Sequence, residues 1–266
     1  MHRALRQVGC LHGDERPGLA VAFSGGLDSR FLCHAARLCG YTVLALHVRG
    51  PHIPPAESKA ALDWARVQNV PVLTAEFDPL SLPEVAGNSR ERCYACKRGL
   101  IQTLQNTLAQ SALACGQAPL PVCDGSNADD MRGFRPGLRA LAEAGVHSPL
   151  AAAGLSKAEI RALAAATGLD RPEQQARPCL LTRLAYGLTP DAALLARLAD
   201  AETALAALPG MGDFRLRLTP APVLQLAALP AMPQTSRRRL EAILEAHGFA
   251  GCAIRVTQQV SGFFDA

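Results

Sequence analysis

Residues 19–29 read L-A-V-A-F-S-G-G-L-D-S, and this stretch decides the fold of the chain. Its apolar part, residues 19–23, has the length of a buried parallel strand and stops at a serine and two glycines. A helical pattern of apolar residues begins directly behind Asp28. The stretch therefore predicts a strand, a tight loop and a helix in direct succession.

The loop has the composition of an anion-binding site. Gly25 and Gly26 carry no Cβ, so the backbone N–H groups from Ser24 onwards can turn inward, and the start of the helix adds partial positive charge. The loop lacks the lysine of a Walker A site and the third glycine of a dinucleotide fingerprint. The alternative to an anion-binding loop is a plain Gly-Gly turn between the strand and the helix. Asp28 would hold a carboxylate beside bound phosphates, where it is the natural ligand for Mg²⁺.

The six residues 24–29, S-G-G-L-D-S, resemble the PP-loop of ATP pyrophosphatases, enzymes that break ATP between its α and β phosphates. Six matched positions between a strand and a helix are much more specific than a lone glycine pair. The resemblance implies that the chain binds ATP and Mg²⁺ through the loop residues Ser24, Gly25, Gly26, Asp28 and Ser29.

The composition indicates a globular protein with room for two domains. The chain has 266 residues, of which 49% are hydrophobic, and its net charge is +4. No apolar run approaches the length of a membrane-spanning helix, and residues 1–16 are too polar for a signal peptide. We therefore expect a cytoplasmic protein with no membrane partner. The charge excess is too small to indicate a nucleic-acid partner, and for the quaternary structure we expect a homo-oligomer.

Strands and helices alternate along the first part of the chain. Apolar runs of strand length at residues 19–23, 42–48, 72–76 and 121–124 are separated by helix-length spacers. This alternation predicts an α/β fold with a doubly wound, mainly parallel sheet, of the adenine nucleotide alpha hydrolase-like type that the PP-loop resemblance implies. Ligands of such sheets bind beyond the carboxyl ends of the strands. Asp124 and Gly125 end the last of these strands and would face the same crevice as the loop.

Two prolines, at positions 172 and 178, interrupt the helical pattern, and we place a domain boundary there. The predicted domains are residues 1–170, which carry the loop, and residues 171–266, a smaller α/β domain. Arg215 and Arg217 alternate on a predicted strand of the smaller domain, so both could clamp a phosphate or carboxylate from one face. The alternative is a solvated basic strand face.

The cysteines offer candidate ligands. Cys93 and Cys96 form a C-x-x-C at the start of a predicted helix, where the helix dipole favours thiolates. Four interpretations are open: half of a zinc site, a thioredoxin-like redox pair, an iron–sulfur site completed by one distant cysteine, or two buried thiols. Cys179 is the distant candidate, because it lies in a polar loop with two arginines. Five other cysteines fall on predicted helices or strands, where cysteine is usually a small core residue: Cys33, Cys39, Cys115, Cys123 and Cys252.

Several segments together resemble the LarE family of sulfur transferases, from about residue 20 to residue 256. Their combination is more specific than the PP-loop, which many unrelated enzymes share. The matching segments are residues 24–29, residues 92–97 (R-C-Y-A-C-K), residues 124–130 (D-G-S-N-A-D-D), residues 135–137 (R-P-G), Cys179 with Arg183, Tyr186 with Gly187, and residues 215–217 (R-L-R).

The resemblance implies a function and its cofactors. LarE enzymes contribute to the nickel-pincer nucleotide cofactor of lactate racemase: they adenylate a carboxylate of pyridinium-3,5-biscarboxylic acid mononucleotide with ATP and replace AMP by sulfur. Some members sacrifice one cysteine, which becomes dehydroalanine. Others hold a [4Fe-4S] cluster on three cysteines and draw on sulfide or another sulfur donor. This sequence resembles the cluster-bearing kind, with Cys93, Cys96, Cys179 and Asp28 as catalytic residues and Asp124, Gly125, Arg215 and Arg217 as binding residues.

Other functions fit part of the pattern. A PP-loop tRNA thiolase is expected to carry an added zinc-binding or RNA-binding module, and none is evident in the sequence. An amide-forming PP-loop synthetase has no need of the three cysteines. A non-catalytic adenine-nucleotide sensor has no need of Asp28 or of residues 124–130. Residues 48–55 depart from the LarE pattern, because they lack a serine that is often found there.

Overall fold

The structure, a computed structural model, describes residues 1–8, 17–132, 136–176, 179–219, 222–227, 234–257, 260 and 264. The chain forms two compact units. The first comprises residues 1–50, 57–79 and 91–177, and we call it the N-terminal unit. The second, the C-terminal unit, comprises residues 51–56, 80–90 and 178–266.

The N-terminal unit is built on a parallel sheet of four strands in the order β3-β2-β1-β4. Val21 at the centre of the sheet lies opposite Ala45 on one neighbouring strand and Cys123 on the other. The mainly parallel α/β sheet predicted from the sequence is confirmed, and its strands coincide with the four predicted runs. The strands are β1 (Gly18–Ala22), β2 (Thr42–Arg49), β3 (Val72–Glu76) and β4 (Val122–Cys123).

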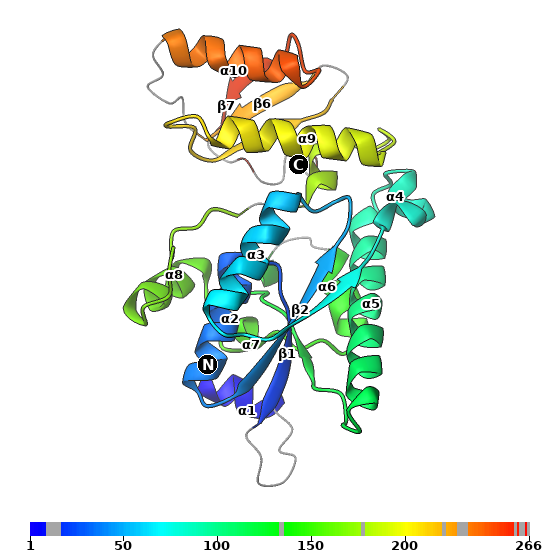
Figure 1. The fold of residues 1–266 in the computed structure, drawn as a ribbon, viewed down its shortest axis with the longest axis vertical. Coiled ribbons are helices and arrows are strands. Elements are labelled where there is room, and N and C mark those ends of the chain that lie inside the picture. The colour runs from blue at the N-terminus through cyan, green and yellow to red at the C-terminus, as the bar shows by residue number, and fades with distance from the viewer. Residues whose placement is uncertain are drawn as a thin grey trace. The chain divides into compact units, whose positions relative to one another are not determined.

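Helices cover both faces of this sheet (Figure 1). Helices α2 (Leu27–Leu38) and α3 (Pro55–Val67) lie on one face, and α5 (Arg92–Ala114) lies on the other. This follows from the strand order, because the chain moves outward from β1 to β3 and then back to β4, and right-handed crossovers in opposite directions use opposite faces. The remaining helical segments are α1 (His2–Val8), α6 (Pro136–Glu143), α7 (Pro149–Ala152), α8 (Lys157–Ala166), η1 (Pro79–Ser81) and η2 (Asp130–Arg132).

The main apolar core of this unit joins β1 to α2, α3 and α8. Leu32 of α2 and Ile160 of α8 are fully buried, and the rings of Phe23 and Trp64 stack with their centroids 5.5 Å apart. Burying a side chain of this size stabilises the fold by about 1.5–3 kcal/mol. The core therefore fixes the carboxyl end of β1, which carries the glycine loop, against α2 and α3.

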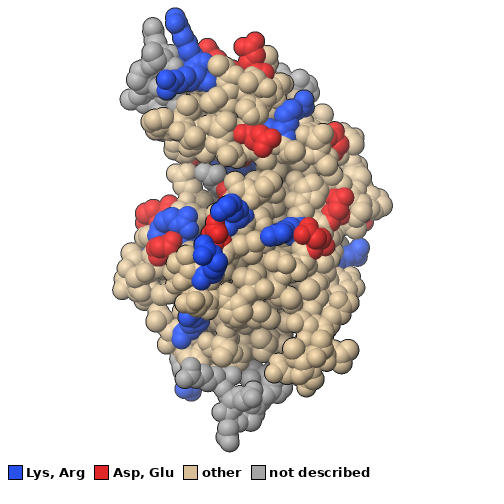
Figure 2. All heavy atoms as spheres, in the orientation of Figure 1, with Lys and Arg blue, Asp and Glu red and all other residues tan. Residues whose placement is uncertain are grey.

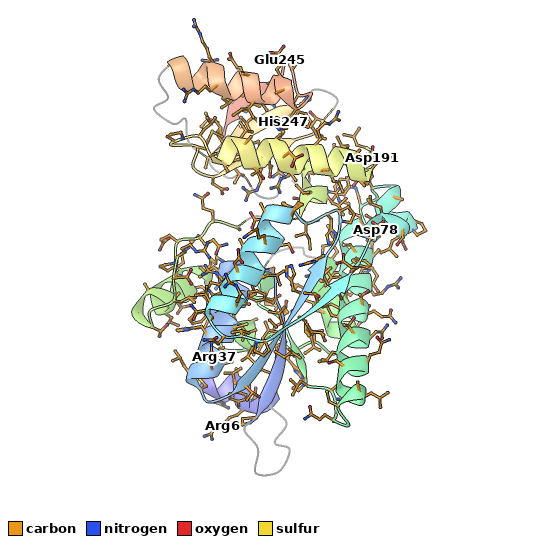
Figure 3. All side chains as sticks on the ribbon, in the orientation of Figure 1. Arg6, Arg37, Asp78, Asp191, Glu245 and His247 are labelled. Atoms are coloured by element: carbon orange, nitrogen blue, oxygen red, sulfur yellow. The ribbon has the colours of Figure 1, made fainter. Side chains whose placement is uncertain are left out.

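The C-terminal unit contains a three-stranded sheet in the order β5-β6-β7, with β5 antiparallel and β7 parallel to β6. Two helices pack against each other on this unit, and the first begins after Asp191, whose carboxylate accepts a hydrogen bond from the N–H of Leu194 at 2.7 Å (Figure 3). The α/β character predicted here is confirmed. The elements are η3 (Leu180–Arg183), α9 (Ala192–Ala206), β5 (Phe214–Arg217), β6 (Val223–Leu226), α10 (Gln234–Ala246) and β7 (Ala253–Val256).

Two segments from earlier in the chain belong to the C-terminal unit because backbone and side-chain hydrogen bonds hold them there. The buried side chain of Asn88, just after α4 (Pro83–Ala86), donates to the carbonyl oxygens of Ala185 and Leu188, each at 2.7 Å. The carbonyl of His52 accepts a hydrogen bond from the N–H of Leu180 at 3.0 Å. The C-terminal unit is therefore assembled from three stretches of sequence.

None of the described helices is both long and apolar enough to cross a membrane. On the face drawn in Figure 2, the described basic side chains are interspersed with acidic ones. A continuous basic surface, which nucleic-acid backbones attract, is absent from the described part of that face.

Candidate functional site

The glycine loop, residues 24–29, follows β1 as predicted, and its last three residues form the start of α2. Gly25 has a φ of +76°, and a Cβ at this position would lie 2.4 Å from the Cβ of Ala61 on α3. Only glycine fits both the backbone conformation and the space. The predicted succession of strand, loop and helix is confirmed.

The side chains of Ser24 and Ser29 form hydrogen bonds within the loop. The hydroxyl of Ser29 donates to the carbonyl of Gly26 at 3.1 Å, and the hydroxyl of Ser24 accepts from the N–H of Gly26 at 3.3 Å. The two hydroxyl oxygens lie 3.3 Å apart. The loop thus places two hydroxyl groups and the first turn of α2 at the carboxyl edge of the sheet, an arrangement suited to an anion.

Asp28 is paired with a lysine from a distant helix. Nζ of Lys157 lies 2.8 Å from each carboxylate oxygen of Asp28, and the two side chains are 24% and 27% exposed, respectively. Lys157 is the first residue of α8, which begins with the predicted capping box of Ser156 and Glu159. The carboxylate of Asp28 therefore already holds one cation at the edge of the loop.

The polar segment after β4 reaches the same place. A Cβ on Gly125 would lie 3.0 Å from the backbone nitrogen of Ser29, so the segment passes directly beside the start of α2. Asp124 is held by the hydroxyls of Ser126 and Ser148, at 2.5 and 2.6 Å. The expectation that the two polar strand ends share one edge of the sheet is confirmed by this contact.

Asp129 and Asp130, the last two residues of the D-G-S-N-A-D-D segment, are held by local contacts. One carboxylate oxygen of Asp129 accepts from the N–H of Lys157 at 2.8 Å, and one of Asp130 accepts from the N–H of Asn127 at 3.0 Å. These bonds hold residues 127–130 in place beside the first residue of α8. Arg135, part of the predicted R-P-G segment, lies outside the described residues.

The cysteines divide by exposure. Cys93 is exposed and Cys96 is half-buried, both in the first turn of α5 as predicted, whereas Cys33 and Cys123 are completely buried. Cys33 and Cys123 are therefore core residues, and burial raises the pKa of each thiol to about 12. The core interpretation was wrong for Cys115, which is exposed at the end of α5 where the helix leaves the apolar core.

Cys179 is half-buried and belongs to the C-terminal unit, whereas Cys93 and Cys96 belong to the N-terminal unit. The carbonyl of Cys179 accepts hydrogen bonds from the backbone N–H and the hydroxyl of Thr182, at 3.1 and 2.7 Å, which set the start of η3. Among the described residues, no group of three or more His, Cys, Asp or Glu side chains is arranged to hold a metal ion. The convergence of the three thiols on one cluster stays a prediction.

Arg215 and Arg217 lie on β5 within a buried cluster of arginines. Both are at most 4% exposed, so the alternative of a solvated basic strand face was wrong. Arg217 donates to Gln225 Oε1 at 2.8 Å and to the carbonyl of Thr182 at 2.6 Å, and Arg215 donates to Asp213 at 2.5 Å. Burial, and after it the nearby charge of Arg183, lower the pKa of Arg215.

Arg183 completes this cluster with a carboxylate from α9. Its Nε and Nη2 each donate to one oxygen of Glu202 at 2.8 Å, and Glu202 also accepts from the backbone N–H of Leu216 at 3.0 Å. Arg183 is 2% exposed. The arginine cluster (Arg183, Arg215 and Arg217) thus contains three guanidinium groups, and its described carboxylate contacts are Glu202 and Asp213.

Over 201 residues the chain is 30% identical to the pyridinium-3,5-bisthiocarboxylic acid mononucleotide synthase of Lactiplantibacillus plantarum, with 75% of this chain and 70% of that enzyme covered. The chain belongs to this synthase family. An uncharacterised protein of Synechocystis is 35% identical over 201 residues, covering 74% of this chain and 71% of its own. Another, of Methanocaldococcus jannaschii, is 29% identical over 168 residues, covering 63% and 61%. No family model matches the chain.

The buried ionic group around Arg30 was not predicted from the sequence. The fully buried guanidinium of Arg30 donates to the side chain and the carbonyl of Asp170, each at 2.9 Å, and to Gln174. Trp64 donates to the same carboxylate at 2.6 Å, and Gln174 donates to the carbonyl of Gly25 at 3.4 Å. The group ties residues 170–174 to the glycine loop. A signal existed in the sequence: Arg30 lies three residues after Leu27, on the apolar face of the helix.

His47 has a structural role, as is usual for a lone histidine near a strand end. Its Nδ1 lies 2.9 Å from the carbonyl oxygen of Phe23 and must donate to it, so Nε2 accepts from the hydroxyl of Ser58 at 2.7 Å. Burial lowers the pKa of His47, which favours this neutral form. His47 thereby connects β2, the residue before the glycine loop, and α3.

Proposed function

We propose that this chain is an ATP-dependent sulfur transferase that converts a carboxylate of pyridinium-3,5-biscarboxylic acid mononucleotide to a thiocarboxylate. The observation that carries the proposal is the similarity to the Lactiplantibacillus plantarum synthase, whose name states the bisthiocarboxylic acid product. The glycine loop with its carboxylate and paired serines gives independent support, because a tight glycine turn at the start of a helix is suited to bind a phosphate.

The proposed reaction needs two bond exchanges. A carboxylate oxygen of the substrate attacks the α phosphorus of ATP, the bond to the β phosphate breaks, and pyrophosphate leaves with the electron pair. A sulfur nucleophile then attacks the carbonyl carbon of the acyl adenylate, and AMP leaves. In this account the N–H groups and hydroxyls of the glycine loop bind the phosphates and stabilise their charge, as preorganised donors do.

Asp28 is the proposed ligand for Mg²⁺, which when bound would stabilise the negative charge of the phosphates. The donor set fits this ion, because a carboxylate offers the hard oxygen atoms that Mg²⁺ prefers. Both oxygens of Asp28 already contact the cationic Nζ of Lys157, so the site favours positive charge. Gly125 supports the same edge by allowing the β4 segment to approach α2.

Three accessible thiols are the proposed ligands of a [4Fe-4S] cluster: Cys93, Cys96 and Cys179. The exposure of the cysteines fits this choice, because Cys33 and Cys123 are buried and their raised pKa values oppose thiolate formation. Cys93 and Cys96 are three residues apart on α5, so they share one face of the helix. Three cysteine ligands leave one iron open, which is the chemistry that such a cluster would supply for carrying sulfide.

The arginine cluster is the proposed anion site of the C-terminal unit. Three guanidinium groups are gathered within one buried cluster, where Arg183 pairs with Glu202 and Arg215 pairs with Asp213. Arginine recognises phosphate and carboxylate groups through its planar fork. We assign the phosphate or free carboxylate of the substrate to this cluster, through Arg215 and Arg217.

Release of pyrophosphate tests the adenylation step. The protein is mixed with ATP, Mg²⁺ and the pyridinium dicarboxylate mononucleotide, and pyrophosphate is measured against a matched control with nicotinamide mononucleotide, which has no carboxylate to adenylate. We expect pyrophosphate release with the dicarboxylate mononucleotide and none with nicotinamide mononucleotide. Release that requires transfer RNA instead would support a tRNA thiolase, and nucleotide binding without any release would support an adenine-nucleotide sensor.

Anaerobic iron and sulfide quantitation tests the cluster. We expect iron binding to be lost in Cys93→Ala, Cys96→Ala and Cys179→Ala and retained in Cys115→Ala, a matched control because Cys115 is an exposed cysteine that directly follows the helix carrying the first two. The sacrificial mechanism predicts instead that Cys93→Ala stays active and that Cys179 loses the elements of H₂S in the intact mass after one turnover.

A further inference from the structure

The glycine loop has no lysine of its own, and the structure supplies one from α8. Nζ of Lys157, 129 residues further along the chain than Asp28, lies 2.8 Å from both carboxylate oxygens of that residue. Gly125 and Ser29 lie beside each other at the same edge, as the close approach at Gly125 shows. Lys157 is thus placed where the loop would receive a phosphate chain.

The backbone of Lys157 is held firmly although its side chain ends at a partly exposed site. The N–H of Lys157 donates to Asp129 at 2.8 Å, and the preceding Ser156 caps α8 through reciprocal bonds with Glu159. Asp129 is fixed in turn by Asn127, whose side-chain oxygen accepts from its N–H at 2.9 Å. These contacts aim a flexible four-carbon side chain at the loop from a rigid base.

The pair with Asp28 is not a structural requirement of the fold. Both side chains are about a quarter exposed, and ion pairs that remain accessible to water contribute only about 0–1 kcal/mol to stability. The chain has only three lysines, Lys59, Lys97 and Lys157, and otherwise uses arginine for its cationic side chains. A compact ammonium group binds phosphate as a point charge, whereas arginine binds as a planar fork.

We propose that Lys157 is a catalytic residue that binds the β and γ phosphates of ATP. With Mg²⁺ and ATP bound, Asp28 would have another cation as its partner, and the ammonium group of Lys157 would turn to the phosphates, which carry more negative charge. As the bond between the α phosphorus and the bridging oxygen breaks, the electron pair goes to pyrophosphate, and Lys157 stabilises the charge that develops there. No proton needs to move in this step. The inference rests on the proposed use of ATP.

Direct binding measurements separate this role from a structural one. Affinities for ATP and for AMP, both with Mg²⁺, are measured by calorimetry on the wild-type protein, Lys157→Met, Lys157→Arg and Lys59→Met. Lys59 is a matched control, because it also pairs with an aspartate, Asp63 at 2.6 Å, but is 78% exposed on α3. A hydrogen bond between charged groups is worth about 1.5–3 kcal/mol, so Lys157→Met should weaken ATP binding by about 10–150-fold.

AMP lacks the β and γ phosphates, so its affinity should stay within about twofold in Lys157→Met, which is a difference of under 1 kcal/mol. Lys157→Arg should retain part of the ATP affinity, and Lys59→Met should match the wild type. An equal loss of ATP and AMP affinity, or unchanged ATP binding in Lys157→Met, would overturn the inference while leaving the proposed function intact. A wild-type protein that binds no ATP would overturn both.

Discussion

The glycine loop and the arginine cluster are the two proposed anion sites of the chain, and they are built differently. The loop uses backbone N–H groups and two hydroxyls, and its charged pair, Asp28 with Lys157, is partly exposed. The arginine cluster uses residues that are at most 4% exposed and whose side chains are held by carbonyl, amide and carboxylate oxygens. Substitution of the partly exposed Asp28 should therefore reduce catalysis with little effect on folding, whereas substitutions in the cluster should destabilise the C-terminal unit.

The largest effect on stability is expected for Glu202→Leu. This change removes the carboxylate that contacts two nitrogens of the buried Arg183 and the N–H of Leu216. Removing one partner of a buried ion pair costs about 3–5 kcal/mol, which urea unfolding would measure as a lower free energy of unfolding. Glu241→Leu on α10 is the control, because its pair with Arg237 is exposed on both sides. A loss below about 1 kcal/mol in Glu202→Leu would mean that the pair behaves like a surface contact.

Asp28→Ala should have a large effect on catalysis and a small effect on stability. We expect pyrophosphate release to fall by about 10²–10³-fold, the usual cost of removing one preorganised group that stabilises reacting charge. The free energy of unfolding should change by less than about 1 kcal/mol, because the pair with Lys157 is accessible to water. Asp63→Ala, which removes an exposed carboxylate that also pairs with a lysine, should leave the rate unchanged. Near-normal release by folded Asp28→Ala would remove the magnesium assignment.

Gly25→Ala tests whether the loop depends on close packing as well as on backbone conformation. Gly145 is a matched control, because its φ of +66° is similar to the +76° of Gly25 but its Cβ position is open. The contact with Ala61 should make Gly25→Ala about 1–3 kcal/mol more destabilising than Gly145→Ala, the typical cost of overpacking. The double variant Gly25→Ala/Ala61→Gly should recover only part of that difference, because the Cα of residue 61 would still lie 2.9 Å from the new Cβ. Equal free energies of unfolding for the two single variants would show that the loop tolerates a Cβ.

The smallest effect is a pH dependence from His47. Burial lowers the pKa of His47 in the folded protein below the usual 6.5. Between this lowered pKa and pH 6.5, the unfolded chain therefore binds a proton that the folded protein does not. The stabilisation is complete above pH 6.5 and is lost as the pH falls through the folded pKa. Unfolding measured from pH 8 to pH 5 should therefore show a flatter dependence in His47→Gln than in the wild type. Parallel curves for the two proteins would contradict the neutral, buried state of His47.

The parts of the molecule that depend on neighbouring residues in sequence could be predicted. The strand, loop and helix around Gly25, the capping box at Ser156 and the C-x-x-C at the start of α5 each follow from a short pattern. The alternation of elements was enough to predict the parallel sheet. In each case the physical cause, such as a missing Cβ or a helix cap, acts within a few residues.

The rest depends on contacts between distant segments, which no local pattern specifies. Asn88 joins residues 80–90 to the C-terminal unit, and Arg30 holds Asp170 across 140 positions. The alternation of Arg215 and Arg217 correctly indicated a shared strand face but gave no information on what would cover it. Burial of a charged side chain requires a partner such as Glu202, and partners of this kind are set by tertiary structure.

The most direct test of the proposed sulfur transfer is the mass of the pyridinium mononucleotide after incubation with the protein, ATP, Mg²⁺ and isotopically labelled sulfide under anaerobic conditions. The account predicts that one carboxylate oxygen is replaced by labelled sulfur for each AMP formed, and that Asp28→Ala gives neither product. Formation of AMP and pyrophosphate with no labelled sulfur in the nucleotide would contradict it.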